Sequence, residues 1–261
     1  MYTDHTPGFG SAAKFIATTV LETYLDSSVY INNGIFILET MGRDTGWLAS
    51  AASLAKMNGK QVADFIYLPE VAFDVDKFLM DVKAKFEEQN QVYIVVSEGI
   101  RTAEGKFVAE SNAQAHDKFG HAQLGGVGLF LKNLIISSGI TKRVKSLELG
   151  VLQRCAMHCA SNIDLEEAYE VGAEALKQAS LGKCGYMIGI KRESNTPYTS
   201  SYFLVEANKI ANNVKYFPTE WINEEGNNLT PEAVEYLEPL VSVVPTVVST
   251  SKLPEFKVFN K

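Results

Sequence analysis

Three charged side chains, Arg43, Glu98 and Arg154, each follow an apolar segment of this chain at the point where the segment ends. An arginine can hold a phosphate through two parallel hydrogen bonds, and a carboxylate accepts hydrogen bonds from sugar hydroxyls. Glycines beside Arg43 and Glu98 would let the main chain approach a ligand closely. These residue types together suit the binding of a phosphorylated sugar.

Each of these residues also has an ordinary interpretation when it is taken alone. An arginine after a strand is most often a surface ion-pair partner, and Glu98 followed by Gly99 could simply end a strand. Glu70, which follows Pro69 at another apolar segment, has no assigned role. The hypothesis of a binding site therefore rests on several such residues meeting at one edge.

The elements that would position these residues alternate between buried strands and amphipathic helices. This order is typical of right-handed βαβ units, so we expect an α/β fold with a Rossmann-like parallel sheet and flanking helices. Ligands of such sheets bind at the carboxyl ends of the strands, which is where the charged residues stand. We expect strands at 34–39, 62–70, 92–99 and 143–150, and helices at 11–26, 45–58, 74–90, 119–139 and 163–182.

The last third of the chain has a different pattern. Residues 185–192 and 198–211 are typical of strands separated by a polar turn. Thr230 followed by Pro231 is a favourable helix start, and Asp74 is expected to cap the helix at 74–90. The C-terminal tail indicates extended, irregular structure.

Composition and charge narrow the classes of partner. The chain has 261 residues, a formal net charge of −7 and a pI near 5.2, which argues against nucleic acid and anionic membranes as partners. No stretch approaches the roughly 18 consecutive apolar residues that a membrane span needs. Three cysteines cannot all pair within the chain, so a cytoplasmic, reduced protein is the simplest interpretation.

Three further motifs resemble binding sites in part. Cys155, His158 and Cys159 lack a fourth ligand at zinc-finger spacing, so no metal is expected there. The glycines around His121 do not form a dinucleotide fingerprint. The glycine turn at residues 7–10 could present N–H groups to a phosphate, but a tight turn before a helix is the better interpretation.

Several longer segments stand out: TDHTPGFGSAAKFIATTV, ETMGRDTGWLA, YLPE, VSEGI, FGHAQLGGVG, LGVLQRCAMHCASNIDLEEAY and the ending LEPLV…LPEF. In the same order and at similar spacing, these segments resemble those of 6-phosphofructokinases. The resemblance is closest to the bacterial branch that uses ATP or pyrophosphate, and it covers essentially the whole chain. It implies transfer of a phosphoryl group from ATP or pyrophosphate to the 1-hydroxyl of fructose 6-phosphate in glycolysis.

The resemblance implies a role for each matching position. Arg43 would bind fructose 6-phosphate and also stabilise the phosphoryl group in transit, while Glu98 would hold the sugar hydroxyls and Arg154 the 6-phosphate. The substrate-binding set that the resemblance implies consists of Met41, Gly42, Arg43, Glu98, Gln153 and Arg154.

This sequence departs from the family pattern at positions that would bind phosphate. Many relatives have a histidine where Val151 stands, and an arginine from a neighbouring subunit where Gly34 stands. A second such arginine corresponds to Lys145, with Arg143 beside it as a possible substitute. The family works as dimers or tetramers, so homo-oligomerisation is expected.

A larger departure precedes Thr3. In the family, a T-I-D-N-D segment with the catalytic base comes just before this point, after a glycine-rich donor half that places Mg²⁺. Residues 1–261 contain neither. We therefore expect a truncated enzyme whose isolated chain is inactive, with Mg²⁺ ligands outside the chain and donor-binding residues unknown. The donor, ATP or pyrophosphate, stays open.

The expected organisation is a sugar-phosphate-binding lobe at 1–152, followed at 153–261 by part of a donor-side lobe, return strands and a C-terminal extension. This second lobe would be incomplete, so apolar surface from 153 onward should be exposed. Two alternatives to the enzyme stay open. One is a non-catalytic sugar-phosphate-binding fragment or subunit, and the other is a Rossmann-like remnant without a ligand.

Overall fold

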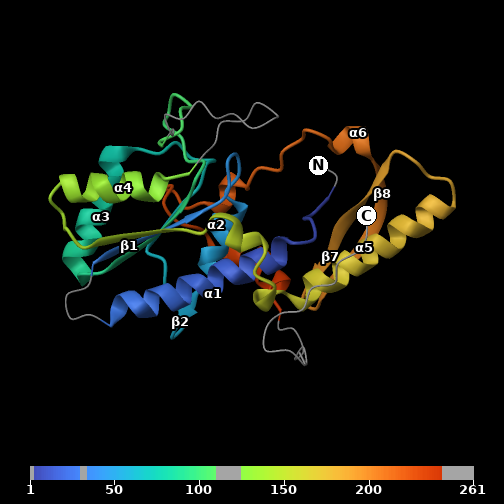
Figure 1. The fold of residues 1–261 in the computed structure, drawn as a ribbon, viewed down its shortest axis with the longest axis horizontal. Helices are drawn as coiled ribbons and strands as arrows, with labels where there is room; N and C mark the ends of the chain where they lie inside the picture. Colours follow the sequence, from blue (N-terminus) through green and yellow to red (C-terminus); the bar gives the residue numbers. More distant parts are fainter. Residues whose placement is uncertain (1–2, 30–33, 110–124, 243–261) are drawn as a thin grey trace.

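The computed structural model describes residues 3–29, 34–109 and 125–242 of the chain. Its largest sheet has four parallel strands in the order β4-β5-β1-β6 (Figure 1). The helices are α1 Phe9–Ser28, α2 Trp47–Ser50, α3 Val75–Gln89, α4 Val127–Ser137, α5 Asn162–Ser180, α6 Ala207–Ile210 and α7 Pro231–Leu237. The strands are β1 Ile35–Thr40, β2 Lys56–Met57, β3 Lys60–Gln61, β4 Phe65–Tyr67, β5 Val92–Ser97, β6 Val144–Glu148, β7 Tyr186–Asn195 and β8 Tyr198–Glu206.

The two central strands are buried on both faces. All six residues of β1 and all six of β5 are buried, and Ile37 of β1 lies opposite Ile94 of β5 in parallel register. Because successive side chains point to opposite faces, Phe36 and Leu38 pack on one side of the sheet and Ile37 packs on the other. The predicted α/β class, with a parallel sheet and flanking helices, is confirmed.

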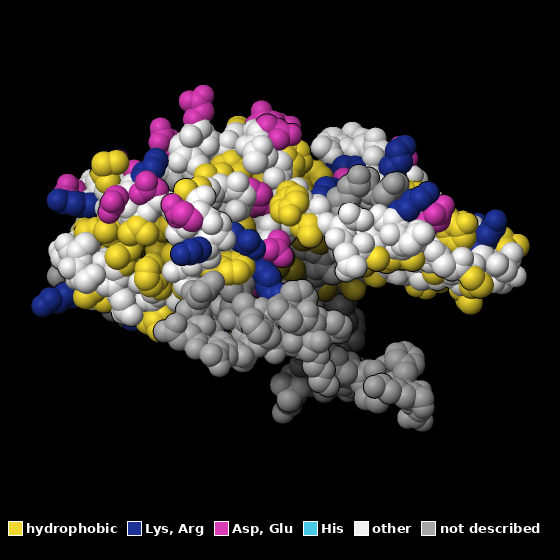
Figure 2. All heavy atoms as spheres, turned by 90° about the horizontal axis from the view of Figure 1, so that it is seen from above, with side chains coloured by type: hydrophobic (Ala, Val, Ile, Leu, Met, Phe, Trp, Pro, Cys, Tyr) yellow, Lys and Arg dark blue, Asp and Glu magenta, His cyan; other side chains and the backbone are white. Residues whose placement is uncertain are grey.

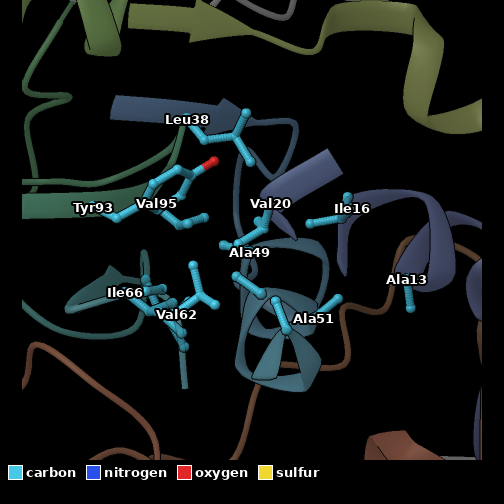
Figure 3. Close-up of a cluster of buried hydrophobic side chains, with 14 of the residues drawn as sticks. Ala13, Ile16, Val20, Leu38, Ala49, Ala51, Val62, Ile66, Tyr93 and Val95 are labelled. Carbon is cyan, nitrogen blue, oxygen red and sulfur yellow. The ribbon is translucent and has the colours of Figure 1, made fainter. Parts of the chain in front are cut away.

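One core lies between the sheet and α1. Ile16 and Val20 of α1 meet Leu38, Val95 and the alanine-rich segment after α2, and all these side chains are fully buried (Figure 3). Alanines there allow close packing of the helix against the strands. The second core lies on the other face, where α3 and α4 contribute Phe78, Val82, Leu131 and Ile135.

Three expected elements differ from the observed ones. The helix predicted at 45–58 ends after α2 and a 3₁₀ turn at Ala51–Leu54, because Asn58 and Gly59 both take positive φ in a tight hairpin turn between β2 and β3. The strand predicted at 62–70 is only β4, and the one at 198–211 ends at Glu206 before α6.

A helix follows each of the two predicted helix starts, Asp74 and Thr230, but the two residues differ in side-chain capping. Asp74 caps α3, since its carboxylate accepts the N–H groups of Asp76 and Lys77 at 2.9 Å. Thr230 precedes α7 without a side-chain capping bond. Residues 119–124 of the predicted helix at 119–139, and residues 243–261 of the tail, lie outside the described residues.

Helix α5 and the antiparallel hairpin β7–β8 extend away from the sheet, and Figure 1 shows them side by side. Along this extension, Figure 2 shows hydrophobic side chains among charged ones. The apolar exposure expected after residue 153 is confirmed, since Leu165 is 48% exposed and Tyr169 and Leu176 are each 74% exposed. Residues 217–240 then return to the core of α1, where Phe217, Ile222 and Ala233 are buried.

No helix in the described part of the chain is long and apolar enough to cross a membrane. The proposed division near residue 152 stays a prediction.

Candidate functional site

A short loop, Met41 to Gly46, joins the carboxyl end of β1 to α2 and carries Arg43. Other segments fix its first two residues. The Met41 N–H donates to Gln153 Oε1 at 3.3 Å, and the Gly42 N–H donates to Glu98 Oε1 at 3.2 Å. The exits of β1, β5 and β6 therefore meet here, as the sequence predicted.

Glycines are required on both sides of this junction. Gly42 has φ of 146°, and the Ser97 hydroxyl donates to its carbonyl at 2.6 Å. A Cβ on Gly99 would overlap the carbonyl of Arg43. The main chain of the Arg43 loop thus lies directly on the main chain after β5, which only a glycine at 99 allows.

Glu98 and Arg43 interact electrostatically. Burial raises the pKa of Glu98 above its ordinary value, and the negative charge of Glu148 adds to the rise. The Gly42 N–H and the positive charge of Arg43 oppose this rise in the pKa. Glu98 is half-buried, and no residue that the structure describes donates a hydrogen bond to its Oε2, so this oxygen can accept one from a hydroxyl group.

β6 is followed by a 3₁₀ turn, Gly150–Arg154, in which some side chains are buried and others are exposed. Gln153 is buried, and its amide donates to the Gly150 carbonyl at 2.8 Å while accepting from Met41. Arg154 and Val151 are exposed. Among the described residues Arg154 makes no hydrogen bond or ion pair, so its guanidinium is available to an anion.

Two predicted residues lie elsewhere. Arg143 and Lys145 stand at the amino end of β6, the opposite edge of the sheet from Arg43 and Arg154. Lys145 forms an exposed ion pair with Asp26 of α1 at 3.1 Å. Within one chain these two residues therefore do not join the others.

Sequence reasoning missed a buried carboxylate in β1. Glu39 is 2% exposed, and its oxygens accept the N–H groups of Gly126 at 3.0 Å and Gly128 at 2.8 Å, at the start of α4. Burial raises the pKa of Glu39, and the negative charge of Glu148 raises it further. The hydrogen bonds from Gly128 and Gly126 oppose this rise. Its signal in the sequence was a charge within an otherwise apolar strand.

Glu70, which the sequence left without a role, also lies at this edge. It follows β4, and its carboxylate accepts hydrogen bonds from Gly46 at the far end of the Arg43 loop and from Phe217. The loop is therefore held at both ends by side chains from other segments.

The segment with Cys155, His158 and Cys159 forms 3₁₀ turns, with Cys159 buried and His158 packed edge-on against Phe15. Within residues 3–29, 34–109 and 125–242, no group of three or more His, Cys, Asp or Glu side chains could hold a metal ion. His121 lies outside these ranges.

Chemically, the edge carries two arginines, Arg43 and Arg154, and the half-buried Glu98 and Glu70 around a closely packed main-chain junction. Arginines bind phosphate oxygens, and Glu98 is suited to accept from a neutral hydroxyl donor. Such a combination of charges fits an anion that also carries hydroxyl groups.

Comparison with known proteins identifies the family of this chain. A family profile described as phosphofructokinase matches residues 1–179. The chain is 40% identical over 241 residues to the pyrophosphate–fructose 6-phosphate 1-phosphotransferase of Methylococcus capsulatus, covering 92% of this chain and 57% of that protein. It is 38% identical over 257 residues to the enzyme of the same name from Xanthomonas campestris pv. campestris, covering 97% and 61%.

A solved structure shares the fold. The pyrophosphate-dependent phosphofructokinase of Marinobacter aquaeolei superposes with a TM-score of 0.81 at 33% identity, covering 97% of this chain and 60% of that one. The chain thus spans about three-fifths of the length of each of these three relatives.

Proposed function

The chain belongs to the phosphofructokinase family, and from this premise we propose that it carries the fructose 6-phosphate-binding part of a 6-phosphofructokinase. The observation that carries the proposal is the junction at which the Arg43 loop lies on Glu98 and Gly99, beside the exposed Arg154. Three strand exits supply these groups, as expected for a ligand at the carboxyl edge of a parallel sheet.

In the proposed complex, Arg154 binds the 6-phosphate and Glu98 accepts hydrogen bonds from the sugar hydroxyls. Arg43 lies near the 1-hydroxyl, where its positive charge stabilises the phosphoryl group during transfer. The electrostatic interaction of Arg43 with Glu98 supports a shared site for these roles. Phosphoryl transfer depends mainly on positioning and charge neutralisation, which two arginines can supply.

Pyrophosphate is the donor we favour, because the relatives described above are pyrophosphate-dependent enzymes by name. ATP is the other donor used in the family. Mg²⁺ is the expected cofactor, but the described residues offer no group of ligands for it. We therefore assign no step to a metal held by this part of the chain.

We propose that a polypeptide of residues 1–261 binds the acceptor without turning it over. By family resemblance the proton acceptor lies in a T-I-D-N-D segment, which these residues do not contain. The test is formation of fructose 1,6-bisphosphate from pyrophosphate and fructose 6-phosphate with Mg²⁺. We expect no product, and steady turnover by this polypeptide would contradict the proposal.

A homo-oligomer, dimer or tetramer, is also proposed. Arg143 and Lys145 lie at the amino end of β6, at the opposite edge of the sheet from the site of their own chain. This position supports a role for them in phosphate binding at a neighbouring subunit. A cytoplasmic location is proposed with the glycolytic role.

A further inference from the structure

Glu70 is the point at which three separate segments meet. It follows β4, and both of its carboxylate oxygens accept the N–H of Gly46 at 3.0 Å. One of them also accepts the N–H of Phe217 at 2.8 Å. The side chain is half-buried, and burial raises its pKa while the bonds from Phe217 and Gly46 oppose the rise.

The contact at Gly46 sets the far end of the Arg43 loop. Gly46 is buried, and a Cβ there would come within 2.6 to 2.9 Å of side-chain atoms of Leu68, two residues before Glu70. The loop therefore leans on the end of β4 and is fastened there by a carboxylate. Its near end is fastened separately, through Met41 to Gln153 and Gly42 to Glu98.

The contact at Phe217 extends this anchor to the C-terminal third of the chain. Trp47, just after the loop, donates its indole N–H to the Lys215 carbonyl at 2.7 Å. Its ring packs on Phe217 with centroids 4.9 Å apart and on Trp221 at 6.2 Å. Residues 215–217 thus pack against the residue that follows the Arg43 loop. Glu70 connects these residues to the loop, because it accepts hydrogen bonds from both Phe217 and Gly46.

We propose that Glu70 is a positioning residue for the acceptor site, holding the Arg43 loop in place through Gly46 and Phe217. The effect on binding of fructose 6-phosphate rests on the proposed function. Arg43 is only three residues from Gly46, so releasing Gly46 frees the main chain that aims its guanidinium. A carboxylate shared by the N–H groups of two buried residues is a strong anchor, because those groups would otherwise lack partners.

Amide hydrogen exchange tests the anchor without any ligand. Glu70→Ala should speed exchange at residues 43–46 by roughly tenfold or more, since their opening no longer breaks a charged hydrogen bond. Glu70→Gln keeps the side chain's shape and one acceptor oxygen, so it should give a smaller increase. It also serves if the alanine variant fails to fold.

Asp64→Ala is the matched control. Asp64 directly precedes β4 and also accepts a main-chain N–H, that of Tyr93 at 2.8 Å, but it stands at the opposite edge of the sheet. Its loss should destabilise the chain without faster exchange at residues 43–46. Wild-type exchange rates at 43–46 in the Glu70 variants would overturn the proposal, as would equal acceleration in the Asp64 control.

Calorimetry with fructose 6-phosphate then tests the consequence for binding. We expect Glu70→Ala to weaken the affinity by roughly tenfold, and Asp64→Ala to leave it unchanged. Unchanged affinity in Glu70→Ala would overturn the positioning role. If the wild-type chain binds no fructose 6-phosphate, the proposed function fails, and exchange at residues 43–46 still decides whether Glu70 anchors the loop.

Discussion

The carbonyl of Arg43 lies so close to the Cα of Gly99 that a methyl group at position 99 would overlap it. This contact joins the loop after β1 to the turn after β5, and it brings Arg43 to Glu98. The geometry of the candidate site therefore depends on a residue that has no side chain.

Gly99→Ala should destabilise the chain by about 1–3 kcal/mol, because the Arg43 loop must move to admit the methyl group. Gly172→Ala in α5 is the control, since nothing lies within 4 Å of its Cβ position. That change should raise the free energy of unfolding by roughly 0.5–1 kcal/mol, as alanine does in a helix interior. Urea denaturation measures both, and equal effects of the two variants would refute the close contact.

The cap of α3 gives a local prediction. Asp74→Ala should cost roughly 1 kcal/mol of stability, because two main-chain N–H groups lose their acceptor. Glu87→Ala, on the same helix, removes only an exposed ion pair with Lys83 at 3.9 Å, and should stay within about 0.5 kcal/mol of wild type. A Glu87 effect as large as that of Asp74 would contradict the assigned cap.

Stability should depend on pH through a histidine held between two carboxylates. His5 lies 2.8 Å from Asp4 and 2.6 Å from Glu167. Burial alone would lower the pKa of His5, but these hydrogen bonds outweigh it and raise the pKa above 6.5. Burial alone would raise the pKa of Asp4. The hydrogen bond to His5 and the positive charges of Arg192 and Lys215 outweigh burial and lower this pKa from 3.8 to about 2.

The sign of the dependence follows from these directions. The contribution of His5 is complete below pH 6.5 and is lost as the pH rises through its higher folded pKa. The contribution of Asp4 is present above pH 3.8 and is lost as the pH falls towards 2. The urea concentration at the unfolding midpoint should therefore decrease below pH 3.8 and decrease again above pH 6.5. His5→Gln should reduce the decrease on the alkaline side. If His5→Gln keeps the wild-type profile, the network is not titrating.

Local patterns were sufficient for the framework of the fold. The apolar runs of β1 and β5 predicted strands buried on both faces, and Asp74 before an amphipathic segment predicted the cap. The helix expected at 45–58 is too long because its end reaches Asn58, the first residue of Asn58-Gly59, a typical two-residue hairpin turn.

Contacts between distant segments could not be predicted in this way. Gln153 meets Met41 across 112 positions, and Glu70 meets Phe217 across 147. A buried amide and a half-buried carboxylate look in the sequence like any polar residues after a strand. Only the packed structure shows that they hold the main chain around Arg43, while the exposed Arg154 remains available to ligand.

Calorimetric titration of residues 1–261 with fructose 6-phosphate tests the acceptor site most directly, with Arg154→Ala and Lys183→Ala as a matched pair. Both variants remove one exposed positive charge, but Lys183 lies after the end of α5, away from the strand exits. The account predicts binding by wild type and by Lys183→Ala, with at least about a tenfold loss of affinity in Arg154→Ala, the cost of one charge-assisted phosphate contact. Binding that is absent in wild type, or equal in the two variants, would contradict it.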